Sequence, residues 1–523
     1  MIKFNDLHSL ICLCGAKSRM LSFAQSDLNA ISYTVEDLAK AVDAVKITGD
    51  KNAEVKMLIA DSRRVAPATV FFAVHGYNTD GNKFVEEAAH RGACAIVSER
   101  PAPRFFPCTW IEVRNISEAM AKAGKSFYGN TEGALKTIGI TGTNGKTSVS
   151  WMVQKILNDL KVKCGLIGTI HYDLGGRCLP ASRTTPEALE LHAMLSQMRF
   201  ADCKAVAMEI SSHSIAQKRV LGLHIDCACF LNLTQDHLDY HKTMEEYFKT
   251  KASLFTGGIG SIPKNAVINI DDPYGRKIAT MLDPSTRLVS FGIESADATI
   301  RAETIEMLPQ KSVFDVVYPE GRVRASVNMP GHYNVLNALA ALSIAYAMGC
   351  DIKSAAESLS TFGGVPGRMQ KVSSEANFDI FVDYAHTDDA LRNGLSMLKK
   401  IVKGRLLVVF GCGGKRDRTK RPLMVKAVQD FADMAWATSD NPRGEPLEQI
   451  FDDMKKGVRD ESKICFIPDR RRAINLAITA AKPGDCILIA GKGHETFQEL
   501  GNTIIPFDDK RVAEELLSLK KIV

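Results

Sequence analysis

The sequence lacks any uninterrupted apolar stretch of the roughly 18 residues that a membrane-spanning helix requires. The longest candidate, residues 338–350, is interrupted by Ser343 and Tyr346, which favours a buried helix. Near the start, HSLICLCGA forms a poor hydrophobic region for a signal peptide, and Met20 is an alternative start of translation. These features predict a protein without a membrane partner.

Paired cysteines and basic clusters are also missing. The 13 cysteines include no CxxC pair and are odd in number, so neither a zinc site nor a disulfide framework is indicated. Scattered reduced thiols are typical of a cytoplasmic protein. The net charge of +6 arises from 66 basic and 60 acidic residues without a basic run, so we expect no nucleic-acid partner.

The 523 residues are enough for several domains, and we predict three: 1–132, 133–366 and 367–523. The Gly/Pro-rich GGVPGR segment marks the second boundary. Short apolar runs that end in polar residues are typical of strands buried on both faces of a mainly parallel sheet, which predicts an α/β fold with ligands at the carboxyl ends of the strands. In the second and third blocks these runs are CGLIGTI, AVAMEI, CACFLNL, AVINI, FDIFVDYAH, RLLVVFGCGG, DMAWATSD and DCILIAGKGHE.

A glycine-rich loop, TGTNGKT, lies between a predicted strand and an apolar stripe at helical spacing. A common phosphate loop has a glycine five positions before its Gly-Lys pair, but Ile140 stands there. Gly142 and Gly145 allow consecutive N–H groups to face a phosphate, Lys146 can reach the β- and γ-phosphates, and Thr147 can hold Mg²⁺. A turn that binds nothing is the alternative, but the strand, glycines, Lys-Thr pair and helix together favour nucleotide binding.

The displaced first glycine resembles the ATP loop of the Mur ligase and folylpolyglutamate synthetase superfamily, whose members form amide bonds by activating a carboxylate with ATP. The resemblance extends from about residue 62 to residue 495. It implies a smaller N-terminal α/β domain, a central P-loop-type mononucleotide-binding domain and a C-terminal Rossmann-like domain. The ATP-binding residues it implies are Gly142, Thr143, Asn144, Gly145, Lys146, Thr147, Ser148, Asn334 and Asn337.

Further segments of the second block indicate Mg²⁺ ligands. Glu209 follows a predicted buried strand near the loop, as a hard-cation ligand would, although by itself it is equally well explained as a helix cap. NLTQDHLDYH fits no common zinc spacing, and it resembles the Mur ligase segment whose first histidine, here His237, contacts the second Mg²⁺. Lys251, which alone would be taken for a solvated lysine, lies in TKASLF, which resembles the site of the family's carbamylated lysine (N6-carboxylysine).

The resemblance therefore assigns two sets of residues. The Mg²⁺ ligands are Thr147, Glu209, His237 and Lys251. The catalytic residues are Lys146, Glu209, His237, Lys251, Arg368 and Asp383, of which the last two come from the third domain and close on ATP.

Other segments resemble the MurE type of the family, which extends UDP-N-acetylmuramoyl-L-alanyl-D-glutamate (UDP-MurNAc-L-Ala-D-Glu). ADSRR and HGYNTDG resemble its uridine pocket, and SSHSIAQKR resembles part of its grip on the muramoyl dipeptide. The family often has Asn where Arg183 stands. The implied binding residues are Ser62, Tyr77, Asn78, Thr79, Thr184, Thr185, Ser211, Gln217 and Arg219.

DNPR, at residues 440–443, resembles the motif of members that use meso-2,6-diaminopimelate, although alone it could be an Asn-Pro turn. Diaminopimelate differs from lysine by a second carboxylate, which an arginine fork can bind. An unpaired, buried Arg443 would reject lysine by an amount on the order of several kcal/mol. The implied diaminopimelate-binding residues are Arg416, Asp440, Asn441, Pro442, Arg443, Gly491 and Glu495.

The resemblance implies a cytoplasmic ligase that uses ATP and Mg²⁺ to join diaminopimelate to UDP-MurNAc-L-Ala-D-Glu through an acyl phosphate, in peptidoglycan precursor synthesis. We expect it to act as a monomer, although the sequence alone leaves the oligomeric state open. His213 and Glu495 are both candidates to assist deprotonation of the amine. One alternative is a ligase of the same type that adds L-lysine. A folylpolyglutamate-type ligase would lack the uridine-pocket segments and DNPR. A nucleotide-dependent switch would need no third domain.

Overall fold

The computed structural model describes residues 33–76, 79–129, 131–308, 311–372, 376–501 and 503–520. Predictions that concern Tyr77, Asn78, Met20 and HSLICLCGA lie outside these residues. The chain divides into two compact units, Met1–Gly129 and Asn130–Val523. Within the described ranges, no helix is both long enough and apolar enough to span a membrane.

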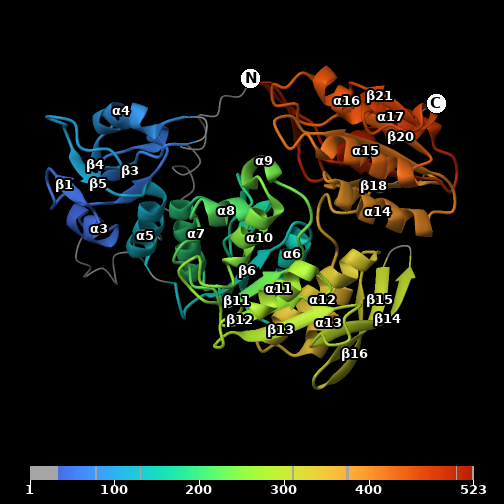
Figure 1. The fold of residues 1–523 in the computed structure, drawn as a ribbon, viewed down its shortest axis with the longest axis horizontal. Helices are drawn as coiled ribbons and strands as arrows, with labels where there is room; N and C mark the ends of the chain where they lie inside the picture. Colours follow the sequence, from blue (N-terminus) through green and yellow to red (C-terminus); the bar gives the residue numbers. More distant parts are fainter. Residues whose placement is uncertain are drawn as a thin grey trace. The chain divides into compact units, whose positions relative to one another are not determined.

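The first unit is built on a five-stranded sheet in the order β1-β5-β4-β3-β2 (Figure 1). Strands β2 to β5 are parallel, and β1 pairs with β5 in the antiparallel direction. Consecutive residues of β3 are buried, as expected for a strand covered on both faces. Its elements are α3 (Val35–Ala41), β1 (Lys46–Thr48), β2 (Met57–Ile59), η1 (Ser62–Arg64), β3 (Thr69–Phe72), η2 (Gly81–Phe84), α4 (Val85–His90), β4 (Ala93–Ser98), β5 (Thr109–Glu112) and α5 (Ile116–Tyr128).

The second unit opens with an 11-stranded sheet in the order β16-β15-β14-β13-β12-β11-β6-β10-β7-β8-β9. Its centre, from β7 to β14, is parallel, and antiparallel strands extend both edges. The strands are β6 (Lys136–Thr141), β7 (Cys164–Ile167), β8 (His171–Asp173), β9 (Cys178–Pro180), β10 (Ala205–Glu209), β11 (Cys227–Phe230), β12 (Asn265–Asn269), β13 (Arg287–Gly292), β14 (Ile300–Leu308), β15 (Lys311–Tyr318) and β16 (Gly321–Val327).

Helices cover both faces of this sheet. The apolar stripe of α6, which includes Val149, Met152 and Ile156, is buried in the same core cluster as much of α12. Helix α12 is apolar on all sides, which suits a helix enclosed by protein, and it contains most of the 338–350 run. The helices are α6 (Lys146–Asp159), α7 (Ala188–Phe200), α8 (Ser212–Ala216), α9 (Leu238–His241), α10 (Met244–Ala252), α11 (Pro273–Thr280), α12 (His332–Ala347) and α13 (Ile352–Ser360).

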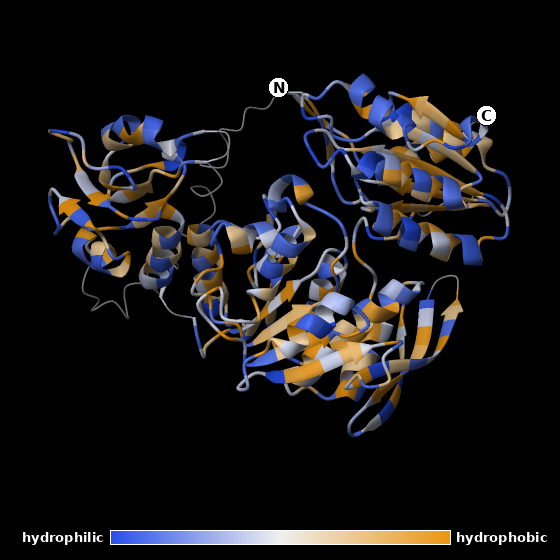
Figure 2. Cartoon of the chain, viewed as in Figure 1, coloured by the Kyte–Doolittle hydropathy of each residue, from blue (hydrophilic) through white to orange (hydrophobic). Residues whose placement is uncertain are grey.

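A six-stranded sheet in the order β17-β18-β22-β19-β20-β21 follows, parallel except for β17. Alternate residues of β19 enter two separate apolar cores, Val408 with α14 to α16 and Val409 with α17 and α18. Much of this sheet is orange, that is hydrophobic, in Figure 2, as expected for strands buried on both faces. The elements are β17 (Gln370–Lys371), β18 (Asp379–Asp383), α14 (Asp388–Ile401), β19 (Leu406–Cys412), α15 (Lys420–Phe431), β20 (Met434–Ser439), α16 (Leu447–Lys455), η3 (Glu461–Lys463), β21 (Ile464–Ile467), α17 (Arg470–Ala480), β22 (Cys486–Ala490), β23 (Phe497–Leu500), β24 (Thr503–Pro506) and α18 (Asp509–Lys520).

The motifs quoted from the second and third blocks leave the carboxyl ends of parallel strands. Neighbouring strands β6, β10 and β11 lead to the glycine-rich loop, to Glu209 and to Asn232. In the six-stranded sheet, β18, β20 and β22 lead to Asp383, Asp440 and Gly491. The predicted α/β class with a mainly parallel central sheet is confirmed.

Candidate active site

The glycine-rich loop joins β6 to α6 and is held by the neighbouring strand end. Gly145 is the N-cap of α6 with φ of +90°, and a Cβ at this position would overlap the side chain of Asn337. The N–H of Asn144 donates to Oδ1 of Asn232 (2.8 Å). Thr147 and Ser148 lie in the first turn of α6, and both line a pocket beside the loop. A helix N-terminus with its free N–H groups is a natural phosphate site.

Lys146 folds over this loop. Its Nζ donates to the carbonyls of Gly142 (2.8 Å) and Thr143 (2.9 Å). Burial lowers the pKa of Lys146, the Glu209 carboxylate acts in the opposite direction, and the charge of Arg368 lowers it further. Lys146 and Arg368 therefore place two positive charges close together beside the loop, where an anion such as phosphate would be stabilised.

Glu209, the last residue of β10, is 1% exposed. Its Oε2 accepts from Thr147 Oγ1 (3.0 Å) and Thr169 Oγ1 (2.9 Å), and its Oε1 accepts from the N–H of Thr169 (2.8 Å). Among the described residues, no three His, Cys, Asp or Glu side chains gather into a ready-made metal cage. Mg²⁺ is commonly held by one or two carboxylates together with phosphates and water, so the Thr147–Glu209 pair fits this ion.

His237 and Lys251 lie close to the loop. His237 has φ of +55°, its Nε2 lies 3.4 Å from Asp236, and its ring packs edge-on against His213 with centroids 4.8 Å apart. Desolvation lowers the pKa of His237, which favours a neutral ring able to bind a metal.

Lys251 is 1% exposed, and its Nζ donates to Gly142 O (2.9 Å) and Thr141 Oγ1 (3.3 Å). Burial, and next the positive charge of Lys146, lower the pKa of Lys251 well below its usual range. The chain thus places two lysines on one carbonyl, that of Gly142. This arrangement favours a neutral or chemically modified Lys251.

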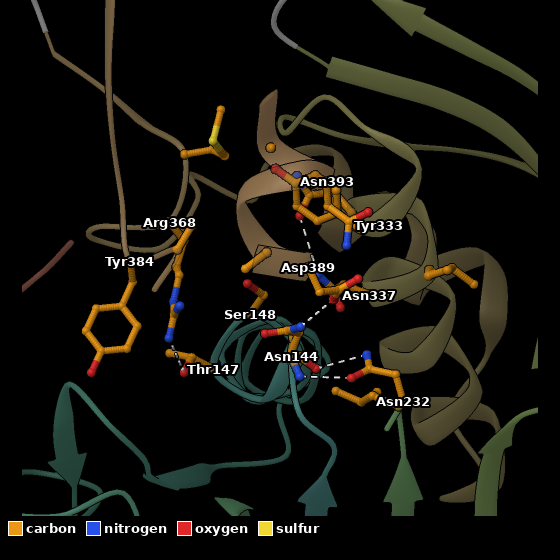
Figure 3. A pocket seen from close by; sticks show the side chains of 18 of the residues that line it. Asn144, Thr147, Ser148, Asn232, Tyr333, Asn337, Arg368, Tyr384, Asp389 and Asn393 are labelled. Atoms are coloured by element: carbon orange, nitrogen blue, oxygen red, sulfur yellow. Dashed lines mark hydrogen bonds between the residues drawn. The ribbon is translucent and has the colours of Figure 1, made fainter. Parts of the chain in front are cut away.

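The pocket beside the glycine-rich loop (Figure 3) is lined on one side by this loop and by α12. On the other side it is lined by residues 368–369 and 383–386 and by α14, which belong to the six-stranded-sheet region. Arg368 Nη2 donates to Thr147 Oγ1 (3.2 Å), and its guanidinium lies over the Tyr384 ring at 4.5 Å. Asp383 accepts from the N–H groups of Met369 (2.6 Å) and Ala385 (2.8 Å), and burial raises the pKa of Asp383.

Asn334 and Asn337 line this pocket from α12 and share a hydrogen bond of 3.4 Å. Sequence analysis did not single out Asn232, Tyr333, Asp389 or Asn393, which line it too. Asp389 accepts from Asn144 Nδ2 (2.8 Å). Asn232 is the first residue of NLTQDHLDYH, so its position in that segment was an available signal, whereas Asp389 follows FDIFVDYAH and stands in no quoted segment.

The predicted dipeptide-binding residues of the second unit gather at the end of β10. Thr185 Oγ1 donates to Glu209 O (2.8 Å) and accepts from the N–H of Ser211 (3.1 Å). Arg219 is 6% exposed and donates to Thr185 O (3.0 Å) and to the Gln217 side chain, while its buried Nε has no partner within the described residues. Thr184 lies beside them and shares a hydrogen bond with Thr169 (3.2 Å).

The predicted residues of the first unit are described separately. Ser62 is buried at the start of η1, and Thr79 accepts from the N–H of Gly76 (2.9 Å). Tyr77 and Asn78, predicted beside them, are outside the described residues.

The DNPR and GKGHE loops are joined by buried polar contacts. Asn441 Nδ2 donates to Glu495 Oε2 (2.8 Å), and Lys492 Nζ donates to Glu495 Oε2 (2.9 Å) and Asn441 Oδ1 (3.1 Å). Asn441 and Lys492 are both 0% exposed. Gly491 has φ of +114°, and a Cβ there would lie 2.7 Å from Asp440 Oδ2. Lys492 was not predicted, although it stands within the motif.

Arg443 corrects one prediction, because it is neither unpaired nor fully buried. Its side chain is 23% exposed, and Nε donates to Glu499 Oε2 (3.1 Å). Glu499 lies on β23, and its carbonyl also accepts from the N–H of Arg443 (3.3 Å). Pro442 precedes Arg443 in the same turn. Arg416 is exposed, and both arginines lie beside Gly413, where a Cβ would be 2.9 Å from Arg443 Nη1 and 3.8 Å from Arg416 Cγ.

Three family models match this chain. They are described as the Mur ligase family catalytic domain, at residues 54–128, the Mur ligase middle domain, at residues 140–345, and the Mur ligase glutamate ligase domain, at residues 367–493. The chain belongs to the Mur ligase family. Mur ligases are ATP-dependent enzymes that form amide bonds, and their three-domain architecture is the one this chain has.

Named Mur ligase relatives match most of the chain. A UDP-N-acetylmuramoyl-L-alanyl-D-glutamate–2,6-diaminopimelate ligase of Geobacillus thermodenitrificans is 43% identical over 468 residues, 88% of this chain and 94% of the relative. A ligase of the same name, numbered 1, from Clostridium acetobutylicum is 40% identical over 486 residues, 92% of this chain and 99% of the relative.

Solved structures of the family share this fold. The structure of a UDP-N-acetylmuramoyl-L-alanyl-D-glutamate–2,6-diaminopimelate ligase is 31% identical with a TM-score of 0.65, covering 94% of this chain and 100% of the other. The MurF ligase of Thermotoga maritima in complex with ADP gives a TM-score of 0.64 at 18% identity, covering 90% of this chain and 99% of the other, which shows the shared fold.

Proposed function

We propose that this Mur ligase uses ATP to join meso-2,6-diaminopimelate to UDP-MurNAc-L-Ala-D-Glu in the cytoplasm, as a monomer. The observation that carries this proposal is the 43% and 40% identity, over about nine-tenths of this chain, to ligases that bear that name. The buried contacts between the DNPR and GKGHE loops support it, because a polar cluster at the strand ends of the third domain suits an amino acid.

The chemistry divides between the 11-stranded and the six-stranded sheets of the second unit. The loop amides and Lys146 neutralise the phosphates of ATP while the glutamate carboxylate attacks the γ-phosphorus, which gives an acyl phosphate and ADP. The amine of diaminopimelate then attacks the acyl carbon, the amide C–N bond forms, and inorganic phosphate and a proton leave. Arg368, which bonds Thr147 from the third domain, adds positive charge on the nucleotide side.

Thr147, Glu209, His237 and a carbamylated Lys251 would hold Mg²⁺, which when bound supplies positive charge to the phosphoryl oxygens. Carbamylation joins the neutral amine of Lys251 to CO₂ with release of a proton, and it replaces a cation with an anion. The nearby charge of Lys146 favours that exchange, since two ammonium groups sharing one carbonyl repel each other.

Substrate binding is assigned to residues at the end of β10 and to residues of the first unit. Arg219 is assigned to a carboxylate or phosphate of the muramoyl dipeptide, which its planar guanidinium suits, and the substrate would compete with Glu187, which lies 3.3 Å from Arg219 Nη2. Thr184, Thr185, Ser211 and Gln217 surround it, and Ser62, Tyr77, Asn78 and Thr79 bind the uridine part.

The function is tested by phosphate release with purified protein. We expect sustained release only when ATP, UDP-MurNAc-L-Ala-D-Glu and diaminopimelate are all present, and a product whose mass equals both substrates less one water. Release with ATP alone would indicate a nucleotide switch instead. Omitting Mg²⁺ provides the metal control.

Arg443→Ala is expected to raise the KM for diaminopimelate by on the order of tenfold to a hundredfold, because the arginine fork binds the distal carboxylate. The effect falls short of that of a fully buried arginine, since Glu499 already pairs with this side chain. Steady-state kinetics with diaminopimelate and lysine would measure it, and the preference for diaminopimelate over lysine should fall by the same factor.

Arg459→Ala is the matched control for that measurement. Arg459 is a 55% exposed arginine of the same domain that bonds Asp430. An unchanged preference in Arg443→Ala, or an equal loss in Arg459→Ala, would contradict the assignment of Arg443.

A further inference from the structure

A fully buried ion pair lies beneath the amino-acid loops. Arg470, the first residue of α17, and Asp509, the first residue of α18, are both 0% exposed in their side chains. The contact is bidentate, with Arg470 Nε to Asp509 Oδ1 at 2.8 Å and Nη2 to Oδ2 at 2.7 Å. A buried pair gains little net stability over apolar residues of equal volume, so stability alone does not explain it.

The remaining donors of Arg470 bind the ends of two strands. Nη2 donates to Ala490 O (2.9 Å) and Nη1 donates to Ser439 O (3.3 Å). These are the last residues of β22 and β20, which lie on either side of β19 in the sheet. The next residue after each is Gly491 or Asp440, so the guanidinium joins the two points at which GKGHE and DNPR begin.

Helix preferences do not account for Arg470. The positive N-terminal end of a helix macrodipole disfavours a cation in its first turn, whereas it favours Asp509 at the start of α18. The N-cap of α17 is already supplied by Asp469, whose side chain accepts from the N–H of Arg472. The identity of Arg470 is therefore explained by its bonds to Asp509 and to the strand ends.

Hydrogen bonds join the two loops to each other and to the end of β20, so a shift of the strand ends would move the loop residues as well. Beyond the Asn441, Lys492 and Glu495 contacts, Gln498 Nε2 donates to Asp440 O (2.8 Å) and to Ser439 Oγ (2.7 Å). These hydrogen bonds fix the relative positions of the groups, and a displacement of about 1 Å at a binding site can lower the rate on the order of a hundredfold.

We propose that Arg470 and Asp509 are positioning residues for the amino-acid pocket, which hold the ends of β20 and β22 at the separation that brings Asn441 and Glu495 together. This inference rests on the proposed function in so far as the amino acid is diaminopimelate. Asp509 lies beyond residue 493, where the match to the glutamate ligase domain ends. Helix α18 thereby becomes part of the pocket's support.

The test compares KM values in full-length protein. Asp509→Asn keeps the side-chain size but removes the charge, and it should raise the KM for diaminopimelate by on the order of tenfold while leaving the KM for ATP unchanged. Arg470→Lys should act in the same direction, because an ammonium cannot serve the carboxylate and both carbonyls with the fixed fork. Asp509→Glu keeps the ion pair but lengthens the side chain, so its KM for diaminopimelate should lie between those of the wild type and Asp509→Asn. If Asp509→Asn does not fold, the test is made with Asp509→Glu and Arg470→Lys.

Asp485→Asn is the matched control. Asp485 is 4% exposed and pairs with Arg405 at 2.7 Å. The two residues directly precede β22 and β19, so this pair lies at the opposite ends of the same strands from the amino-acid loops. It should lower thermal stability without changing the KM for the amino acid.

Two results would overturn the inference: an unchanged amino-acid KM in the folded Asp509 and Arg470 variants, or an equal rise in Asp485→Asn. If the wild-type enzyme joins lysine instead of diaminopimelate, the proposed function fails, and the same comparison made with lysine still tests the positioning role.

Discussion

Lys251→Ala should lower kcat by about two to three orders of magnitude while the protein keeps its fold. The buried amine lies 2.9 Å from Gly142 O, on the loop that is proposed to hold the phosphates. As a carbamate it would carry a negative charge beside Lys146, where an unmodified ammonium would add a second positive charge. Alanine removes that anion, so the loss should fall on kcat. A short carboxylate such as acetate at high concentration should restore part of the activity.

Lys249→Ala is the control for this variant, since Lys249 lies on the same helix, α10, but is 70% exposed and pairs with Glu245. Carbon-13 NMR after exchange with labelled bicarbonate should show a carbamate signal in wild-type protein and in Lys249→Ala, but not in Lys251→Ala. Removing dissolved CO₂ should lower wild-type activity reversibly. Full activity of Lys251→Ala, or a carbamate signal that persists in it, would refute the assignment.

The strand ends that hold the candidate site residues were predictable because a parallel sheet buried on both faces leaves a simple pattern, an apolar run followed by polar residues. This pattern pointed to Glu209, although alone it left a helix cap equally open, whereas Asp440 was singled out by the resemblance of DNPR to a family motif. The glycine-rich loop was found by its residue types, since Gly145 permits the backbone to turn where a side chain would meet Asn337.

Other features depend on contacts that no local pattern encodes. The antiparallel strands β14 to β16 alternate exposed and buried residues, a period-2 signal that was present in the sequence but was not used. The pairing of Arg443 with Glu499 joins positions 56 residues apart. The Arg470–Asp509 pair depends on two helix starts meeting beneath the sheet, which neither helix pattern indicates.

Lys146→Ala is expected to lower kcat/KM for ATP by about three orders of magnitude, because one fixed cation near a transferring phosphoryl group is worth that much in a site that excludes water. Its ammonium already lies within 2.9 Å of the loop carbonyls of Gly142 and Thr143, so little reorganisation is needed when phosphates arrive. The KM for diaminopimelate should not change, since the amino-acid contacts come from the other sheet. Coupled measurement of ADP formation gives both values.

The comparison that makes this prediction decisive uses Lys155→Ala, a lysine of the same helix that pairs with Asp159 at 2.7 Å. Both variants remove one positive charge from α6, so a general electrostatic effect would appear in both. Only a group in contact with the phosphates should separate them by about three orders of magnitude. If Lys146→Ala retained full ATP-dependent ligation, the loop would bind nucleotide through its backbone alone, and the positive charge at the reacting phosphorus would have to come from Arg368 and the bound metal.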